Sequence, residues 1–213
     1  MMQITANPYA AAEAGFSEAV RKQLLVPLKR WLLLNFRLDD SHIERQSDRK
    51  WFAANLLPRL ENVRQGRVLF VGCAFYTYKY LKNFNKAVDL ITVDYDAHNA
   101  MWGGHNHLVA DIQQVDRLVE PASVDIVLLN GIFGHGVNTP EAQTRTYEAL
   151  HNIMKPDGLL LVGWNHDLSQ DPLELDACQE LYYRTGYEGL PERTCFTDST
   201  HVYDFLRAKQ KSR

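Results

Sequence analysis

In the last two thirds of the chain, aspartate residues follow several apolar runs. Asp94 directly follows the run LITV, and Asp96 comes two residues later, on the same side of an extended chain. A carboxylate fixed at the end of a strand can accept hydrogen bonds from both hydroxyls of a ribose, and such charge-assisted bonds are the stronger kind. Asp94 is therefore the first candidate for a ribose contact and Asp96 the second, while a plain turn-capping role for Asp94 stays open.

A glycine-rich stretch, NGIFGHG, begins at Asn130, where another apolar run ends. Three glycines within six residues at a strand end indicate a backbone that lies close to a ligand or bends sharply, and a ligand-free loop is the alternative. His135 lies inside this stretch, and its ordinary pKa of about 6.5 suits a general base near neutral pH. A purely structural histidine is equally compatible with the sequence.

Alternating short strands and helices are expected to position these residues. The residue pattern predicts strands over 67–73, 89–96, 107–111, 123–131 and 159–164, with helices over 75–84, 98–103, 112–119 and 140–155 between them. A helix from about 173 to 186 and two strands, 191–198 and 201–208, follow. The last two strands are joined too tightly for a crossover helix, so they must be antiparallel.

This alternation predicts an open, mostly parallel sheet with helices on both faces, in which ligands bind beyond the carboxyl ends of the strands. Residues 1–66 instead have the pattern of helices. Ser17 is a candidate N-cap, Pro27 predicts a kink, and a second helix runs from about Ser47 to Pro58. We therefore expect an N-terminal helical cap over 1–66, whose basic residues form a solvated face, and a sheet domain over 67–213.

Composition excludes several classes of protein. The 213 residues are 46% apolar and 23% charged, which is typical of a globular chain, and the net charge of -3 gives no attraction to nucleic acid. The three cysteines are isolated, so we expect no disulfide framework or zinc knuckle and a reducing, cytoplasmic location. The first residues lack a signal-peptide pattern, and no apolar run is long enough to span a membrane. The histidine spacing predicts no metal site.

The segment from Arg67 to Lys209 resembles a class I S-adenosylmethionine-dependent methyltransferase. The matching pieces, in order, are VLFVGC, LITVDYD, VAD, SVDIVLLNG and ALHNIMKPDGLLLVGW, the last of which resembles the family's L-K-P-G-G turn. The resemblance implies a Rossmann-like three-layer α/β/α sandwich with a seven-strand sheet that ends in an antiparallel hairpin. It also implies S-adenosylmethionine as cofactor and methyl transfer to an oxygen or nitrogen of a small-molecule acceptor.

The resemblance places the cofactor in the loops after the first four strands. The residues that it implies there are Gly72, Cys73, Ala74, Tyr76, Thr77, Asp94, Tyr95, Asp96, Asp111, Ile112, Asn130 and Gly131. Asp111 would receive the adenine amino group with Ile112 beside the ring, although a plain helix N-cap looks the same in sequence. His135 would be the catalytic base, and it would line the acceptor site with Trp164, Asn165 and His166.

The glycine loop departs from the family pattern, which is an acidic residue followed by Gly-x-Gly-x-Gly. Phe70 stands in place of the acid, Ala74 in place of the second glycine and Tyr76 in place of the third, so that only Gly72 is kept. Because alanine adopts a positive φ only at a cost, the loop must turn differently or the cofactor must shift. Hydroxyl groups of Tyr76 and Thr77 could replace the lost backbone contacts.

Two other functions stay open. A methyltransferase-like binding or scaffold domain that has lost its cofactor is compatible with the altered glycine loop. A nicotinamide-dependent oxidoreductase fits Asp94, but the chain lacks the G-x-G-x-x-G pattern of such enzymes, and they do not require the closing hairpin. The sequence leaves the oligomeric state open.

Overall fold

The computed structural model describes residues 26–36 and 45–211. The chain divides between Asp39 and Asp40 into two compact units, and helix α2 (Val26–Phe36) belongs to the first of them. The division thus comes earlier than the expected one at residue 66, because the helical segment 47–61 belongs to the unit that contains the sheet. Ser17 lies outside the described residues. In the two described ranges, no helix is both long and apolar enough to cross a membrane.

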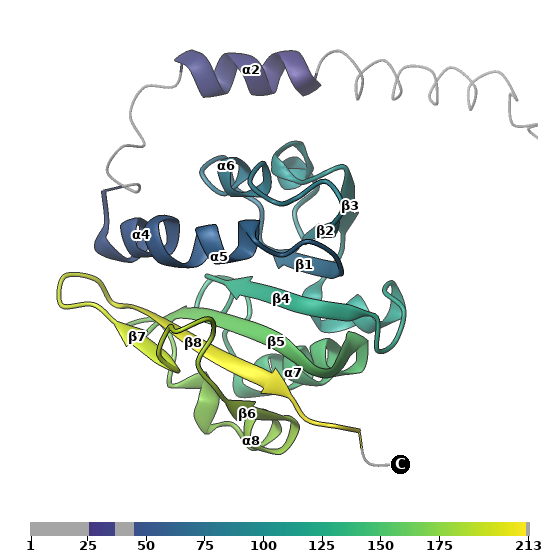
Figure 1. Ribbon diagram of the computed structural model, residues 1–213, viewed down its shortest axis with the longest axis vertical. Helices are drawn as coiled ribbons and strands as arrows, with labels where there is room; N and C mark the ends of the chain where they lie inside the picture. The colour runs from purple at the N-terminus through teal and green to yellow at the C-terminus, as the bar shows by residue number, and fades with distance from the viewer. Residues whose placement is uncertain (1–25, 37–44, 212–213) are drawn as a thin grey trace, which may run out of the picture. The chain divides into compact units, whose positions relative to one another are not determined.

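An eight-stranded sheet lies at the centre of the second unit, counted over the described residues (Figure 1). Its strands are β1 (Arg67–Val71), β2 (Asp89–Asp94), β3 (Asn106–Val109), β4 (Val124–Asn130), β5 (Met154–Asn165), β6 (Tyr182–Arg184), β7 (Arg193–Cys195) and β8 (His201–Ala208). They lie in the order β3-β2-β1-β4-β5-β8-β6, and β7 also pairs with β8. Strands β1 to β5 are parallel and β8 is antiparallel to β5, which confirms the predicted sheet.

The sequence predicts a single strand beside the last one, but two short strands, β6 and β7, lie there instead. β6 pairs with residues 206–208 of β8 and β7 with residues 202–204, both in antiparallel fashion. Because β5 occupies the other edge of β8, the two short strands follow one another along the same edge. Between them the chain turns back at Glu188 and Gly189, which both have a positive φ. The helix expected to reach residue 186 accordingly ends at Leu181, before β6.

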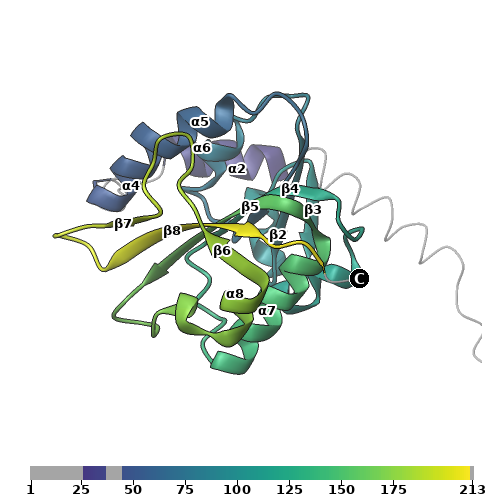
Figure 2. The same ribbon diagram turned by 60° about the horizontal axis from the view of Figure 1, so that its bottom comes forward.

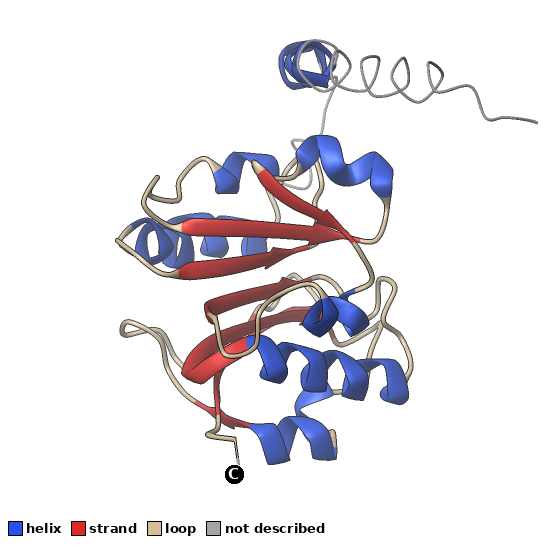
Figure 3. Cartoon of the chain, turned by 90° about the vertical axis from the view of Figure 1, so that its right-hand side faces the viewer, coloured by secondary structure: helices blue, strands red, loops and turns tan. Residues whose placement is uncertain are grey.

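Helices cover both faces of the sheet (Figures 2 and 3). One face carries α4 (Ser47–Trp51), the π-helical turn η2 (Phe52–Leu56), α5 (Leu57–Glu61) and the short helix α6 (Tyr78–Leu81). The other face carries the 3-10 helix η4 (Ile112–Arg117), α7 (Pro140–Ile153) and α8 (Asp176–Leu181). Two further 3-10 helices are η3 (Ala97–Trp102) and η5 (Pro172–Glu174). Each face has its own cluster of buried apolar side chains, which confirms the three-layer sandwich.

The helical segment before β1 continues through Pro58, where the sequence predicts its end. Proline lacks an N–H group, and in an α-helix its ring clashes with the carbonyl group four residues earlier. Pro58 follows the π-helical turn η2, whose hydrogen bonds reach one residue further back, and we attribute the tolerance of proline to this wider turn. Phe52, Leu56 and Leu60 are in consequence all buried in the same cluster beneath this segment.

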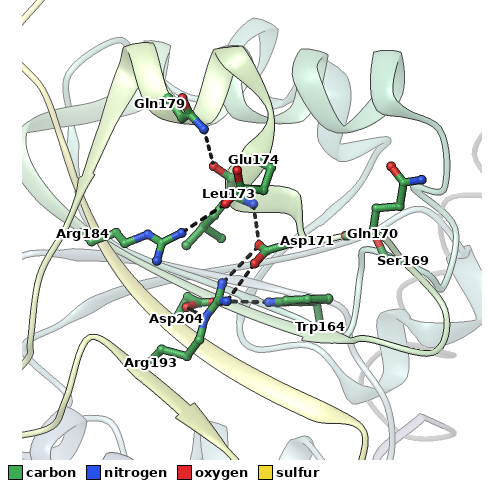
Figure 4. Close-up of polar contacts among 10 residues, drawn as sticks. All are labelled: Trp164, Ser169, Gln170, Asp171, Leu173, Glu174, Gln179, Arg184, Arg193 and Asp204. Atoms are coloured by element: carbon green, nitrogen blue, oxygen red, sulfur yellow. Dashed lines mark hydrogen bonds and ion pairs between the residues drawn. The ribbon is translucent and has the colours of Figure 1, made fainter.

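A partly buried ion-pair network closes the antiparallel end of the sheet (Figure 4). Arg193 of β7 binds two carboxylates: Asp204 through Nε and Nη2, at 2.6 and 3.0 Å, and Asp171 through Nη1 and Nη2, at 2.7 and 3.1 Å. Asp204 is 1% exposed and also accepts the indole N–H of Trp164 at 2.8 Å. The network ties β7 and β8 to the loop that follows β5.

We expect Arg193→Met to destabilise the protein by about 3–5 kcal/mol, because it leaves the buried Asp204 carboxylate without its cation. Urea-induced unfolding followed by circular dichroism measures the change. Arg184 is the matched control, since its ion pair with Glu174, at 3.6 Å, is exposed. Arg184→Met is expected to cost less than about 1 kcal/mol. Equal losses in the two variants would contradict the role given to the buried carboxylate.

Candidate functional site

A cavity of about 570 Å³ lies at the carboxyl ends of β1 to β4. Its size is in the range of pockets that bind small molecules. The predicted site residues that line it each end or follow one of these strands: Gly72, Cys73, Ala74, Tyr76, Thr77, Asp94, Tyr95, Asp111, Ile112, Asn130, Gly131 and His135. Because parallel strands bring their carboxyl ends to one edge of the sheet, residues far apart in the sequence meet around a single cavity.

Asp94 is fixed at the end of β2 by three N–H donors. Its Oδ2 accepts the Cys73 N–H at 2.7 Å, and its Oδ1 accepts the Asp96 N–H at 2.9 Å and the Asn99 side-chain amide at 3.3 Å. An ionised carboxylate has about four acceptor positions, so three bonds leave capacity for a ligand hydroxyl. Asp94 therefore caps its own turn and still faces the cavity with an acceptor.

The loop after β1 turns on a single glycine. Gly72 has a φ of +82°, whereas Ala74 keeps a negative φ, so a glycine at position 74 has no conformational role here. The Ala74 N–H donates to Thr77 Oγ1, and the Thr77 hydroxyl donates to the Ala74 carbonyl, both at 2.9 Å. This hydroxyl is thus used inside the loop. Burial, followed by the charge of Asp94, raises the pKa of the Cys73 thiol to about 12, so the thiol stays protonated.

The loop after β3 brings Asp111 and Ile112 to the cavity. Asp111 Oδ1 accepts the Gln113 N–H at 2.9 Å, which caps η4, and Gln113 Nε2 approaches both carboxylate oxygens at 3.2 and 3.3 Å. The N-cap role is therefore real, but Asp111 is exposed and lines the cavity as well. Ile112 and the 75% exposed Tyr95 add apolar surface to this end of the cavity.

Asn130, at the end of β4, contacts a buried histidine. His201 Nε2 lies 3.0 Å from Asn130 Oδ1, and Gly163 makes room for the pair, because a Cβ at this position would lie 2.1 Å from the same oxygen. Burial, followed by the charges of Arg49 and His135, lowers the pKa of His201 to about 3. His201 is therefore neutral, and Arg49 and His135 are the basic groups that line this end of the cavity.

The loop that carries His135 bends sharply, as its glycines predict. Gly131, Gly134 and Gly136 have φ values of +68°, +90° and +137°. A side chain at Gly134 would also meet the neighbouring loop, since a Cβ there would lie 2.7 Å from Leu168 Cβ. His135 is exposed at the wall of the cavity, within reach of a bound ligand.

Four predicted residues do not line the cavity. Asp96 caps η3 at the surface, where its carboxylate accepts the backbone N–H of His98 at 2.8 Å. Trp164 is buried in the ion-pair network of Figure 4, Asn165 Oδ1 lies 3.0 Å from His201 Nδ1, and His166 is exposed beyond β5. Trp164 and Asn165 are the last residues of β5 and His166 follows it, one strand beyond the four that surround the cavity.

Arg49 lines the cavity although the sequence pattern placed it on a solvated helix face. The helix that precedes the first strand runs back along the sheet, so its first residues lie at the carboxyl edge. No local pattern around Arg49 indicates this position, because it depends on how the helix packs against the sheet. Other lining residues that the sequence did not single out include Asn99, Gln113 and Val137. Within the described ranges, no three potential metal ligands form a group.

Comparisons with known proteins agree on the fold. No protein-family model matches the sequence, and no curated protein matches it significantly. The N-methyltransferase NodS from Bradyrhizobium japonicum WM9, in complex with S-adenosyl-L-homocysteine, aligns with a TM-score of 0.59 at 14% identity, over 85% of this chain and 98% of that chain. A TehB-like SAM-dependent methyltransferase from Corynebacterium glutamicum aligns with a TM-score of 0.56 at 17% identity, over 80% of this chain and 100% of that chain.

A third similar structure spans nearly the whole chain. It is the 1,6-didemethyltoxoflavin-N1-methyltransferase from Burkholderia thailandensis, with bound 1,6-didemethyltoxoflavin and S-adenosylhomocysteine. It aligns with a TM-score of 0.54 at 15% identity, over 99% of this chain and 94% of that chain. Together with the strand order and the antiparallel β8, these likenesses show that the chain has the class I S-adenosylmethionine-dependent methyltransferase fold.

The loop geometry predicts that position 72 requires a glycine and that position 74 does not. Gly72→Ala is expected to destabilise the protein by at least about 1–2 kcal/mol, because it forces a side chain into a positive φ and places Cβ 3.0 Å from Ile132 Cδ1. Ala74→Gly, which would restore the family glycine, is expected to destabilise by about 0.5–1 kcal/mol through the freedom of the unfolded chain. Chemical denaturation measures both. Stabilisation by Ala74→Gly would show that position 74 is strained.

Proposed function

We propose that this protein is an S-adenosylmethionine-dependent methyltransferase that methylates an oxygen or nitrogen of a small-molecule acceptor. The observation that carries the proposal is the Asp94 carboxylate. It lines the cavity at the end of β2 in a class I methyltransferase fold, and its three N–H donors leave an acceptor position open. That is the chemistry that a ribose hydroxyl requires.

In this proposal the nucleoside half of the cofactor lies over β2 and β3. Asp94 accepts hydrogen bonds from the ribose, Tyr95 and Ile112 contact the adenine ring, and Asp111 accepts a hydrogen bond from the adenine amino group. All four side chains belong to residues that line the cavity. The residues present therefore fit the group, since they offer acceptors for its hydroxyl and amino groups and apolar surface for its ring.

When bound, the cofactor supplies a methyl group carried on a sulfonium ion. The task of the chain is then to hold the acceptor atom in line with that methyl group and to exclude other geometries. The loop after β4 is the natural place for the acceptor, because β4 lies next to β1 on the side away from the nucleoside. Where the acceptor atom carries a proton, His135 accepts it.

A small-molecule acceptor is supported by the shape and charge of the chain. The site is a cavity of about 570 Å³, and the net charge of -3 gives no attraction to a nucleic acid. One of the similar structures described above holds bound 1,6-didemethyltoxoflavin. In this chain the loop that carries His135 forms part of the cavity wall, so a small molecule in the cavity would lie within reach of this loop.

A binding domain without cofactor is the second candidate, and one observation favours it. The N–H groups of Gly72, Cys73 and Ala74 all donate within the protein, to Val93 O, Asp94 Oδ2 and Thr77 Oγ1. This part of the loop therefore offers no free donor to a ligand. The methyltransferase proposal requires that side chains supply the contacts that a glycine loop provides elsewhere.

Calorimetric titration of the purified protein with S-adenosylhomocysteine and with NAD distinguishes the candidates. Binding of S-adenosylhomocysteine alone supports the methyltransferase proposal. Binding of NAD alone would instead indicate the nicotinamide-dependent oxidoreductase. If neither compound binds, the enzyme proposals fail and the binding domain stands.

Asp94→Asn is expected to weaken the binding of S-adenosylhomocysteine at least about tenfold, because a neutral amide is a poorer acceptor for the ribose hydroxyls. Asp96→Asn is the matched control, since it removes a carboxylate two residues away that does not line the cavity, and its affinity should stay within about twofold. Calorimetry measures both variants, and circular dichroism verifies that they are folded. If Asp96→Asn lost affinity for S-adenosylhomocysteine and Asp94→Asn did not, the ribose contact would have to be assigned to Asp96.

A further inference from the structure

Arg49 is a cation placed inside the cavity with few protein partners. Its side chain is 14% exposed, and its Nε is buried and has no hydrogen-bond partner among the described residues. The nearest carboxylate is that of Asp48, whose Oδ2 lies 3.4 Å from Arg49 Nε without hydrogen-bond geometry. The other oxygen of Asp48 accepts the Ser199 hydroxyl at 3.2 Å, so this carboxylate is shared between two partners.

The surroundings keep this guanidinium charged and positioned. Its Cζ lies 5.1 Å from the centre of the Tyr76 ring, a distance at which a cation is attracted to the ring face. Burial acts to lower the pKa of Arg49, but Tyr203, Tyr76 and Asp48 outweigh this effect and the pKa is raised. Arginine is planar and presents its N–H groups in a fork that matches a carboxylate.

The first three N–H groups of the glycine loop beside Arg49 are not free to donate hydrogen bonds to an anion. Those of Gly72, Cys73 and Ala74 are all engaged within the protein. A negatively charged group that enters this part of the cavity therefore needs a side-chain donor. Arg49 lies against Tyr76 of the same loop and is the cation available there.

We propose that Arg49 binds a carboxylate group in the cavity, at the end opposite the proposed nucleoside site. The carboxylate has two possible sources, the amino-acid tail of the cofactor or the methyl acceptor, and the choice between them rests on the proposed function. In either case the carboxylate accepts hydrogen bonds from the guanidinium N–H groups, while Asp48, whose other oxygen accepts the Ser199 hydroxyl, lies beside the arginine.

The first test compares two ligands that differ in the amino-acid tail. Calorimetry measures the affinities of S-adenosylhomocysteine and of 5′-methylthioadenosine, which lacks the tail and its carboxylate, for the wild-type protein and for Arg49→Gln. Loss of at least about tenfold in the affinity for S-adenosylhomocysteine, with 5′-methylthioadenosine within about twofold, assigns Arg49 to the cofactor carboxylate. Retained binding of 5′-methylthioadenosine also shows that the variant is folded.

Two further variants sharpen this comparison. Lys50→Gln is the matched control, since it removes the same charge from the next residue of α4, which is exposed and does not line the cavity. It should leave both affinities within about twofold. Arg49→Lys keeps the charge but loses the fork, so it should recover part of the affinity for S-adenosylhomocysteine. An effect of Lys50→Gln equal to that of Arg49→Gln would reduce the role of Arg49 to general charge and overturn the proposal.

The second test addresses the acceptor. If Arg49→Gln leaves the affinity for S-adenosylhomocysteine unchanged, the protein saturated with this ligand is titrated with sodium benzoate, and so is the variant. Binding by the wild type that is lost in Arg49→Gln assigns the carboxylate to the acceptor. If benzoate does not bind, or binds equally to both proteins, the proposal is overturned.

Different results would contradict the proposed function and the carboxylate site at Arg49. A wild-type protein that binds neither S-adenosylhomocysteine nor 5′-methylthioadenosine overturns the methyltransferase proposal. The ligand-free protein titrated with benzoate then still tests Arg49. Binding that is lost in Arg49→Gln supports a carboxylate site, and its absence overturns it.

Discussion

The hydrogen bond from the Cys73 N–H to Asp94 is the contact on which the candidate site depends. It joins the end of β2 to the first turn of the loop after β1, at 2.7 Å and away from solvent. Since a bond to an ionised acceptor is stronger than one between neutral groups, it fixes the loop and the carboxylate together. The loop consequently needs only Gly72 at a positive φ, and the missing glycines at positions 74 and 76 do not prevent it from closing.

The sheet and the edge that carries the site could be predicted from the sequence, because both follow from local pattern. Apolar runs such as IVLL mark strands buried on both faces, and the residues after them must reach the carboxyl edge. The strand pattern thus predicts Asp94, Asp111 and Asn130 at this edge, and all three line the cavity. Twelve-residue β5, by contrast, begins at Met154 rather than 159, because pairing with β4 continues across an irregularity that no local pattern reveals.

The contacts that could not be predicted depend on partners far away in the sequence. Trp164 looked like a wall of the acceptor site, but its indole N–H is bonded to Asp204, and nothing near position 164 indicates that partner. Nothing in the local sequence distinguishes Gly163 from an ordinary glycine in a strand. In the structure, the side chains of Asn130 and His201 occupy the space where a side chain at position 163 would lie. The charge of a short helix does not indicate which end of the sheet the helix faces, so the sequence predicts a solvated position for Arg49.

The division of the sixth strand position has a consequence for the outer edge of the sheet. A long, straight edge strand presents a continuous row of free N–H and C=O groups on which another chain can extend the sheet. Here the outer edge along β8 consists of β6 and β7, three residues each, and the turn at Glu188 and Gly189 separates them. Neither piece is long enough to hold a foreign strand in register, so this end of the molecule is protected against edge-to-edge association by the interruption itself.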